Sequence, residues 1–495
     1  MASFTIVVLA SAVILSFLIQ KLRNKRNSNL PPAPKGLPLI GNLHQFDSST
    51  SHFQFWQLSK KYGALMSLKF GSAQVLVVSS SKMAKQIMKT HHLKFSNRPT
   101  NLALQRFSYD GLDLAFAPCN SYSIEMKKIC MVHLLSSSRV KSFRPIREFE
   151  VLQVLEKISK LAVASKSIDL SECLISLAID IICRVGFGKK YDEHEKQKLQ
   201  ELLRETEHLF TSLFVSDYFV FGRFIDKLSG LMHRLEKNFK ELDNFLDNII
   251  QEHLHSTTSN AHKQEDIIDI LLQILKDGSS KVDLTLNHIK AVLMNILTGA
   301  SDTIPATVIW VMTYLMKNPL VMDKVQEEIR SIVGNKGFVY EDDIVNLTYL
   351  KFVIKETLRM QPPILLIPRE SSEHCNLEGY QIPPKTQIFV NLWAIGRDPE
   401  VWENPEEFCP ERFMGETVNF YGKNFELIPF GSGRRACPGI SMGLATVELC
   451  LANLLYKFDW KMPIGLMKED LDLETLPGIT RHKKNPLCLM ARIYT

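Results

Sequence analysis

The sequence lacks the paired cysteines that a disulfide framework or a zinc site would need. Its 495 residues include nine cysteines, an odd number, and no two of them are spaced as C-x-x-C. Thiols scattered in this way are typical of proteins that fold in a reducing compartment such as the cytosol. Most of the nine therefore predict small buried side chains, not disulfides or metal ligands.

The chain also lacks the features that nucleic-acid or dinucleotide binding would need. Lys and Arg number 59 against 53 for Asp and Glu, a formal net charge of +6, and much of the excess lies near the N-terminus. A nucleic-acid footprint would need a basic stripe within the folded body. No G-x-G-x-x-G loop is present either. We therefore expect no nucleic-acid partner, and any electrons that the protein uses must come from a separate protein.

The chain begins with an apolar run over residues 4–19, interrupted only by Thr and Ser and followed at once by a basic stretch over 21–26. A cleaved secretory signal is the alternative, but such a signal carries its charges before the run. By the positive-inside rule the basic stretch stays cytosolic. The sequence therefore predicts a membrane anchor over 1–20, a basic and proline-rich linker over 21–38, and a folded body over 39–495.

Apolar residues at three- and four-residue spacing dominate the folded body, and this spacing predicts amphipathic helices. The expected helices cover residues 81–92, 143–165, 195–215, 232–255 and 264–277. Extended segments are fewer: 64–70 and 74–78 predict a hairpin, and 380–390 predicts a second extended patch. The expected fold class is mainly α with a small β-rich region.

One predicted helix, over 284–317, is long and apolar and is expected to run through the centre of the protein. Its middle contains Gly299, Asp302, Thr303 and Pro305. Because Pro305 has no N–H to donate to the carbonyl one turn earlier, we expect the helix to kink or open there. A polar, distorted turn in an apolar helix suggests a task, and a tolerated kink with Asp302 satisfied locally is an equally good interpretation.

The segment 430–439, FGSGRRACPG, packs three glycines around Cys437. Glycine permits positive φ and lets backbone N–H groups approach a ligand closely. We expect Pro438 to occupy the first position of a helix over 440–458, which would place Cys437 at the positive end of the helix dipole and favour thiolate over thiol. Two neighbouring arginines add positive charge, so the loop is suited to bind a metal or an electrophile.

The pattern F-x-x-G-x-R-x-C-x-G resembles the haem-binding loop of the cytochrome P-450 family, and the resemblance extends over essentially the whole chain. It implies the cytochrome P-450 fold, preceded by one N-terminal transmembrane helix, with haem b (iron protoporphyrin IX) as cofactor. Residues 39–495 would be the haem-thiolate catalytic domain, with Cys437 as the iron ligand in a loop that includes Gly431 and Gly439. A thiolate ligand pushes electron density onto iron and favours O–O cleavage.

Two further motifs carry the same resemblance. The segment KETLR over 355–359 matches the family's E-x-x-R and supplies Glu356 and Arg359 on one face of a helix, and FCPERF over 408–413 supplies Arg412. The resemblance implies that these three residues form a buried charge network that holds the haem loop in place. Such a network needs all of its members, because a lone buried charge is costly.

The polar turn of the central helix, GASDT over 299–303, resembles the family's oxygen-activation motif. The resemblance implies that Thr303 hydrogen-bonds dioxygen and that Asp302 supports proton delivery, which is general-acid chemistry.

Four basic residues are implied by the resemblance as contacts of the haem propionates: Arg98, Lys127, Arg369 and Arg435. The chain departs here from the family's Trp-Arg-x-x-Arg pattern, since Ser123 and Ile124 replace the first two residues and Lys127 replaces the last. Lysine keeps the charge but not the bidentate geometry of arginine. Each missing charge-assisted hydrogen bond is worth about 1.5–3 kcal/mol, so weaker haem retention is expected.

Within the family the chain looks most like plant microsomal members of specialised metabolism. This likeness implies a monooxygenase that inserts one oxygen atom from dioxygen into a small hydrophobic or aromatic substrate. It also implies a single-pass protein of the endoplasmic reticulum membrane with a cytosolic catalytic domain, served by a membrane-bound NADPH-dependent flavoprotein reductase. The alternatives are a degenerate, catalytically impaired member, or a haem-thiolate isomerase or dehydratase, against which the retained Asp302 and Thr303 speak.

Six apolar residues are candidates for lining the substrate pocket, and core packing is the alternative for each of them. They are Phe107, Leu112, Ala300, Ile304, Ile364 and Leu366. An apolar lining would imply a hydrophobic or aromatic substrate.

Overall fold

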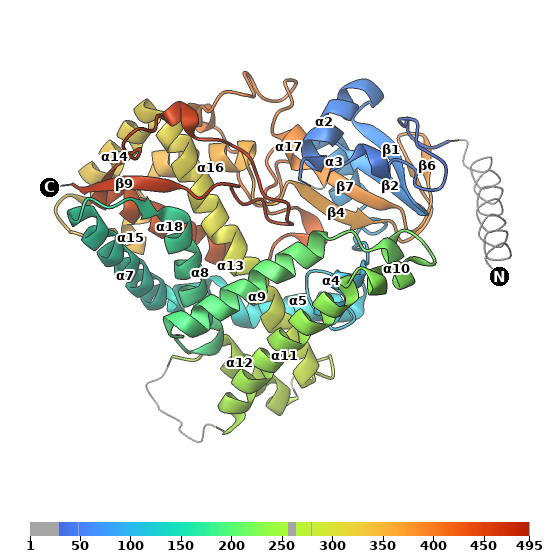
Figure 1. Cartoon of the computed structure of the whole chain (residues 1–495), viewed down its shortest axis with the longest axis horizontal. Helices are drawn as coiled ribbons and strands as arrows, with labels where there is room; N and C mark the ends of the chain where they lie inside the picture. Colours follow the sequence, from blue (N-terminus) through green and yellow to red (C-terminus); the bar gives the residue numbers. More distant parts are fainter. Residues whose placement is uncertain (1–28, 48, 256–263, 279, 495) are drawn as a thin grey trace.

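The computed structural model describes residues 29–47, 49–255, 264–278 and 280–494, and Figure 1 shows their arrangement. The predicted anchor over 1–20 lies outside the described residues. Among the described helices, Leu286–Lys317 and Ile440–Lys457 are long and apolar enough to cross a membrane. More than half of the apolar stretch of each is buried within the protein, which is the property of a core helix.

Helices make up most of the described chain, as the apolar spacing predicts. In chain order they are α2 (Ser51–Tyr62), α3 (Ser81–Lys85), α4 (Leu102–Phe107), α5 (Ser121–Ile129), α6 (Ser137–Ser142), α7 (Arg144–Val163), α8 (Leu170–Phe187), α9 (Glu193–Thr211), α10 (Gly222–Leu228), α11 (Leu231–His255), α12 (Ile267–Asp277), α13 (Leu286–Lys317), α14 (Pro319–Val333), α15 (Glu341–Ile344), α16 (Thr348–Met360), α17 (Leu392–Ile395) and α18 (Ile440–Lys457). The helices expected over 143–165, 195–215, 232–255 and 264–277 are confirmed as α7, α9, α11 and α12.

The strands gather in three small sheets. They are β1 (Leu65–Phe70), β2 (Ala73–Val78), β3 (Ile168–Asp169), β4 (Leu366–Glu370), β5 (Cys375–Leu377), β6 (Tyr380–Ile382), β7 (Gln387–Asn391), β8 (Phe458–Lys461) and β9 (Cys488–Ile493). The largest sheet has the order β1-β2-β7-β4 and lies at the end of the molecule opposite α7 and α14 (Figure 1). The predicted hairpin is confirmed, with Leu65 paired to Val78.

Two predicted elements differ from the structure. The extended patch over 380–390 is two strands in different sheets, because β6 pairs with β5 whereas β7 pairs with β2 and β4. The helix expected over 81–92 is α-helical to Lys85 and continues as a π-helical turn, Gln86–Thr90. Apolar periodicity identifies a buried face but carries no information about which neighbour an element will pair with.

Helix α13 forms the centre of the fold and packs most extensively on α8. Side chains along most of its length are buried, as its apolar composition predicts. The expectation that it opens at Pro305 is wrong, since the α-helix is continuous from Leu286 to Lys317. The hydroxyl of Thr303 donates to the carbonyl of Gly299 (2.7 Å) and that of Thr307 to the carbonyl of Thr303 (2.7 Å), so side chains supply extra hydrogen bonds around the proline.

A fully buried ion pair within α16, Glu356–Arg359, is bonded to the chain segment that precedes the cysteine loop. The Glu356 carboxylate accepts from Arg359 Nε (2.7 Å) and Nη2 (2.8 Å), from Arg412 Nε (2.9 Å) and from the N–H of Cys409 (2.9 Å). Arg359 also donates to the carbonyls of Gly396, Pro405 (2.7 Å) and Glu407 (3.1 Å). The three charges predicted to form a network therefore do lie together, and their partners saturate the carboxylate and both guanidinium groups.

Replacing Glu356 with alanine would leave two guanidinium groups without their carboxylate, one of them fully buried. We expect the free energy of unfolding to fall by about 3–5 kcal/mol, the usual cost of removing one member of a buried pair. Urea denaturation of the holoprotein measures it. The matched control is Glu474→Ala, which breaks the exposed Glu474–Lys484 pair and should leave the unfolding midpoint unchanged. Equal effects of the two substitutions would contradict the network's structural role.

Candidate active site

Cys437 lies in a tight loop between the segment 420–430 and α18. The backbone N–H of Cys437 donates to the carbonyl of Phe430 (2.9 Å), which closes the loop around Gly431 and Gly433. Both glycines have φ of +71°, and a Cβ on Gly433 would lie 2.7 Å from the carbonyl oxygen of Met88. Glycine is needed at these positions because other residues rarely adopt positive φ. The loop is therefore held in one shape with the Cys437 thiol open to a cavity.

The helix expected over 440–458 is confirmed as α18, but Pro438 is not its first residue. Gly439 is the N-cap of α18 and Ile440 its first residue, so Pro438 precedes the cap and Cys437 lies two residues before it. The expected help from the helix dipole is correspondingly weaker. Burial raises the pKa of the Cys437 thiol, and the Gly439 N–H and the Lys127 ammonium only partly offset this effect. A metal ion bound to the sulfur would displace the proton directly.

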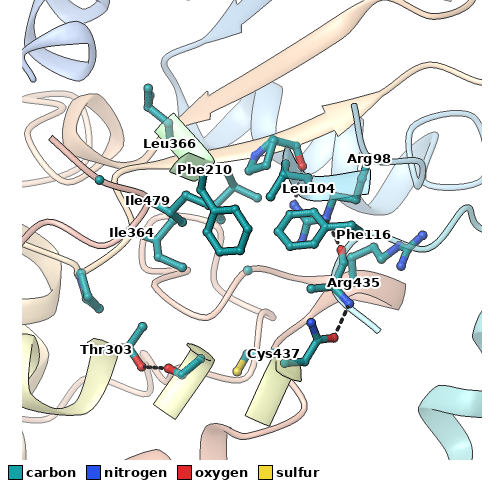
Figure 2. A pocket seen from close by; sticks show the side chains of 18 of the residues that line it. Arg98, Leu104, Phe116, Phe210, Thr303, Ile364, Leu366, Arg435, Cys437 and Ile479 are labelled. Carbon is teal, nitrogen blue, oxygen red and sulfur yellow. Dashed lines mark hydrogen bonds between the residues drawn. The ribbon is translucent and has the colours of Figure 1, made fainter. Parts of the chain in front are cut away.

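The cavity beside Cys437 has a volume of about 1630 Å³. Ordinary ligand pockets measure roughly 300–1,000 Å³, so this one has room for a large cofactor together with a substrate. Figure 2 shows the Cys437 sulfur and Thr303 on one side of it and the rings of Phe210 and Phe116 on the opposite side.

Arg98 and Arg435 line this cavity, and Arg369 lies next to them but is buried and is not among the lining residues of the described cavity. Arg98 donates to the carbonyls of Pro368 (2.5 Å) and Ala115 (3.1 Å), and Arg435 donates to those of Ser96 (2.9 Å), Leu114 (3.1 Å) and Ala117. Arg369 is buried, and its Nη2 has no partner among the described residues. Figure 2 shows Arg98 and Arg435 close together.

Electrostatic repulsion within this group is strong because little negative charge faces it. Burial, and then the charge of Arg435, lower the pKa of Arg98 to about 9. Burial, Arg98 and Arg435 together lower the pKa of Arg369. Asp113 is the carboxylate that partly offsets Arg98 and Arg435, but it already accepts from two backbone N–H groups and from Asn295. The group as a whole is suited to receive an anion with more than one carboxylate.

Lys127, expected at the propionates, contacts the cysteine loop instead. Its ammonium donates to the carbonyls of Arg434 (2.7 Å) and Ala436 (3.1 Å), while also lining the cavity. Ser123, which stands where the family has tryptophan, is the third residue of α5 and forms a capping box with Asn120. Ser123 and Ile124 also line the cavity. The altered helix is therefore well formed and braces the loop through a different set of bonds.

The two proposed oxygen-activation residues lie differently with respect to the cavity. Thr303 lines it, whereas Asp302 does not lie among its lining residues. Asp302 interacts outside its own helix: its Oδ1 lies 3.3 Å from His482 Nε2, and its carboxyl group is a neighbour of that of Glu207. The interpretation of a local, merely tolerated polar turn is therefore not supported for Asp302.

Of the six pocket candidates, Ala300, Ile304, Ile364 and Leu366 line the cavity. Phe107 and Leu112 do not line it in the described structure, which corrects that prediction. Phe107 packs in an aromatic cluster, with its ring centroid 5.3 Å from that of Phe210 and 5.8 Å from that of Phe239. Leu112 contributes its carbonyl, which accepts from the Tyr122 hydroxyl (2.7 Å).

Several lining residues escaped the sequence reasoning because they come from distant segments. Phe116 lies on the α4–α5 loop, Phe210 on α9 and Ile479 in the C-terminal loop. Asn295 of α13 also lines the cavity, and its Oδ1 accepts from the N–H groups of Leu114 (2.9 Å) and Ala115 (3.1 Å). Of these residues, only Asn295 could have been singled out from the sequence, because an amide side chain within an apolar helix suggests a specific polar contact.

Comparison with known proteins also indicates an enzyme that binds haem through a cysteine. The sequence matches the family model described as Cytochrome P450 over residues 31–490. Cytochrome P450 71A1 from Persea americana is 46% identical, with 97% of each chain covered. A zebra fish cytochrome P450 solved with progesterone superposes with a TM-score of 0.78 at 24% identity, covering 89% of this chain and 99% of that one.

Two other relatives carry names of reactions. Strychnine-11-hydroxylase from Strychnos nux-vomica is 44% identical, covering 97% of this chain and 94% of its own length. The 5-OH-xanthotoxin synthase from Pastinaca sativa is 46% identical, covering 94% and 93%. The chain belongs to the cytochrome P450 family. It is a haem-thiolate monooxygenase of plant specialised metabolism, which uses dioxygen, a hydrophobic substrate and electrons from a redox partner.

The residues of the cavity fit a haem group. A thiol opens into the cavity from a glycine loop, two guanidinium groups line the cavity, and the buried guanidinium group of Arg369 lies next to them with little acidic compensation. The unpartnered Nη2 of Arg369 is a donor that a propionate oxygen would satisfy. Cys437 would hold the iron, and Arg98, Arg369 and Arg435 the propionates.

Arg369→Met tests this assignment because it should raise the stability of the apoprotein and lower its affinity for haem. The substitution removes a buried charge that two like charges repel, so the apoprotein should melt at a higher temperature. Haem affinity should fall at the same time, by on the order of tenfold for one lost charge-assisted bond. Spectrophotometric haem titration and thermal denaturation of the apoprotein measure the two effects. The control is Arg223→Met, whose side chain is exposed and does not line the described cavity. Unchanged haem affinity in Arg369→Met would remove Arg369 from the propionate site.

Proposed function

We propose that the protein hydroxylates a small aromatic substrate, with haem b held by Cys437 and with Thr303 and Asp302 delivering protons to the reacting oxygen. The observation that carries this proposal is that one cavity has Cys437 and Thr303 on one side and the rings of Phe116 and Phe210 on the other. Aromatic rings favour stacked or edge-on contact with a flat substrate. The names of relatives that act on xanthotoxin and strychnine support the same substrate class.

Haem, when bound, supplies the one-electron and dioxygen chemistry. The chain's own residues do the rest. Phe116, Phe210, Ile364 and Ile479 exclude water and orient the substrate, since apolar walls leave it few alternative positions. The Thr303 hydroxyl, which donates to the Gly299 carbonyl, can turn its hydrogen toward the cavity and act as the last donor to the reacting oxygen.

The proposed electron donor is a membrane-bound NADPH-dependent flavoprotein reductase. The absence of a G-x-G-x-x-G loop in the sequence supports a separate donor. Exposed basic residues on the cysteine side of the protein, including Arg434 and Lys128, would suit an acidic redox partner. We further propose that residues 1–20 anchor the protein in the endoplasmic reticulum membrane and that the linker over 21–38 leads to a cytosolic catalytic domain over 39–495, on the strength of the apolar run and the basic stretch.

The first test of this function is the reduced, carbon-monoxide-treated difference spectrum of the expressed protein, followed by titration with xanthotoxin. Thiolate ligation gives a red-shifted Soret band, and substrate entry shifts the oxidised spectrum. Cys437→Ala should abolish the red-shifted band, because among the described residues Cys437 is the cysteine of this loop that lines the cavity. A band at the unshifted position in the unsubstituted protein would identify a catalytically impaired member of the family.

Thr303→Ala tests proton delivery. With xanthotoxin as probe, we expect hydrogen peroxide released per NADPH to rise, and product formation to fall by about tenfold or more, since a positioned proton donor contributes ~10²–10⁴-fold. The matched control is Thr298→Ala. Thr298 lies on the same helix and makes the same kind of bond, to the Met294 carbonyl (2.8 Å), but is not among the lining residues of the described cavity. Identical peroxide release from the two variants would place the donor elsewhere.

Removal of residues 1–28 tests the anchor. We expect the full chain to stay in the membrane fraction through alkaline washing, and the shortened chain to be released by the same treatment while keeping its red-shifted band. A full-length protein that alkaline washing releases would contradict an integral anchor.

A further inference from the structure

Three titratable side chains from three distant segments meet beside Thr303. They are Glu207 on α9, Asp302 on α13 and His482 in the C-terminal loop that precedes β9. Asp302 Oδ1 lies 3.3 Å from His482 Nε2, and the carboxyl groups of Asp302 and Glu207 are neighbours that interact electrostatically. The backbone of Ile479 and Thr480 lies close enough to the Glu207 carboxyl group to lower its pKa, against the larger effects of burial and of Asp302. The cluster thus has a defined geometry.

The two carboxyl groups cannot both be ionised at this separation, because like charges in contact raise the free energy of the doubly charged form. Each has one buried oxygen, Glu207 Oε2 and Asp302 Oδ2, to which no N–H or O–H group of the described residues donates. One proton placed between the two groups would satisfy both oxygens. Burial, and then the Asp302 carboxylate, raise the pKa of Glu207 well above its ordinary value. Glu207 is therefore the group on which we place this proton.

The cluster lies between solvent and the cavity. The side chains of His482 and Asp302 keep 22% and 17% of their exposure, whereas the facing carboxyl oxygens are fully buried. Asp302 is the direct chain neighbour of Thr303, whose side chain lines the cavity. A proton can therefore enter at His482, wait on the acid pair and leave on the Thr303 side.

We propose that Glu207 is a positioning residue that stores a proton for Asp302, so that Glu207, Asp302 and His482 form a relay from solvent to Thr303. This inference rests on the proposed role of Thr303 and Asp302 and adds the source of their protons. The Glu207 proton moves to Asp302 and Asp302 passes it toward Thr303, which leaves both carboxyl groups ionised. A proton from solvent, carried by His482, then restores the pair, and the cluster ends each cycle with the charge it began with.

The first measurement uses the unsubstituted holoprotein and needs no substrate. A protonated, buried carboxylic acid has a C=O stretch in the infrared that ionised carboxylates lack, and this band shifts in D₂O. We expect such a band at neutral pH, and we expect Glu207→Gln to remove it. The matched control is Glu201→Gln, an exposed residue of the same helix, which should leave the band unchanged. A spectrum without the band, or a band that survives Glu207→Gln, overturns the proposal.

The second measurement separates proton storage from mere bracing of α9. Glutamine keeps an acceptor for the Ile479 and Thr480 N–H groups and a donor toward Asp302, but it has no proton to give. With xanthotoxin as probe, we expect Glu207→Gln to lower product formed per NADPH by about tenfold while retaining the red-shifted band, and Glu207→Asp to recover part of the loss. The solvent isotope effect on product formation should increase in Glu207→Gln.

The outcomes distinguish this inference from the proposed function on which it rests. Uncoupling by Thr303→Ala with normal coupling in Glu207→Gln would overturn the relay alone. Normal coupling in both would overturn the proposed role of Thr303 as well. If Glu207→Gln loses haem, His482→Asn replaces it, since His482 is partly exposed and outside the cavity lining. His482→Asn should lower coupling and enlarge the isotope effect, and unchanged values in that variant would overturn the relay.

Discussion

Three neighbouring guanidinium groups, two of which line the cavity, impose the constraint around which the haem site is organised. Charges of one sign in a poorly solvated region repel strongly, and Asp113 offsets only part of that repulsion. The same arginines hold the protein together, since Arg98 bonds to the carbonyl of Pro368 and Arg435 to those of Ser96 and Leu114. A dianionic cofactor that neutralises them would stabilise β4 and the α4–α5 loop at the same time. Binding of the cofactor would thus also increase the local stability of these two segments.

The contrast with the Glu356 cluster is informative. There the carboxylate faces two guanidinium groups and a backbone N–H, so the charges are paired within the protein and need no ligand. The two groups of charges have different roles: the Glu356 cluster fixes the segment leading to the cysteine loop, and the arginines leave positive charge for a ligand. Lys127 combines both kinds of role, because it binds the loop carbonyls and still faces the cavity. Loss of the usual tryptophan and arginine has therefore changed how α5 braces the loop without removing the brace.

At the turn of α13 that carries Asp302 and Thr303, α9 and the C-terminal loop come together. The carboxyl group of Glu207 joins all three, and Phe210 and Ile479, from two of these segments, also line the cavity. A substrate that displaces either side chain would act on the element that carries the acid pair. The same segments therefore carry part of the cavity wall and the acid pair, through side chains that are neighbours in space but not in sequence.

The sequence by itself determined the chemistry that local patterns encode. Glycine spacing around Cys437 identified a loop suited to bind a metal, and apolar periodicity identified the central helix, because both depend on residues near one another in the chain. The resemblance to the family implied the haem and the network of Glu356, Arg359 and Arg412. The tertiary structure alone decided the rest. Phe107 is core and Phe210 lines the cavity, Pro305 leaves α13 continuous, and Asp302 meets Glu207 and His482. Burial and charge pairing between distant segments depend on how helices pack, and no local spacing records that packing.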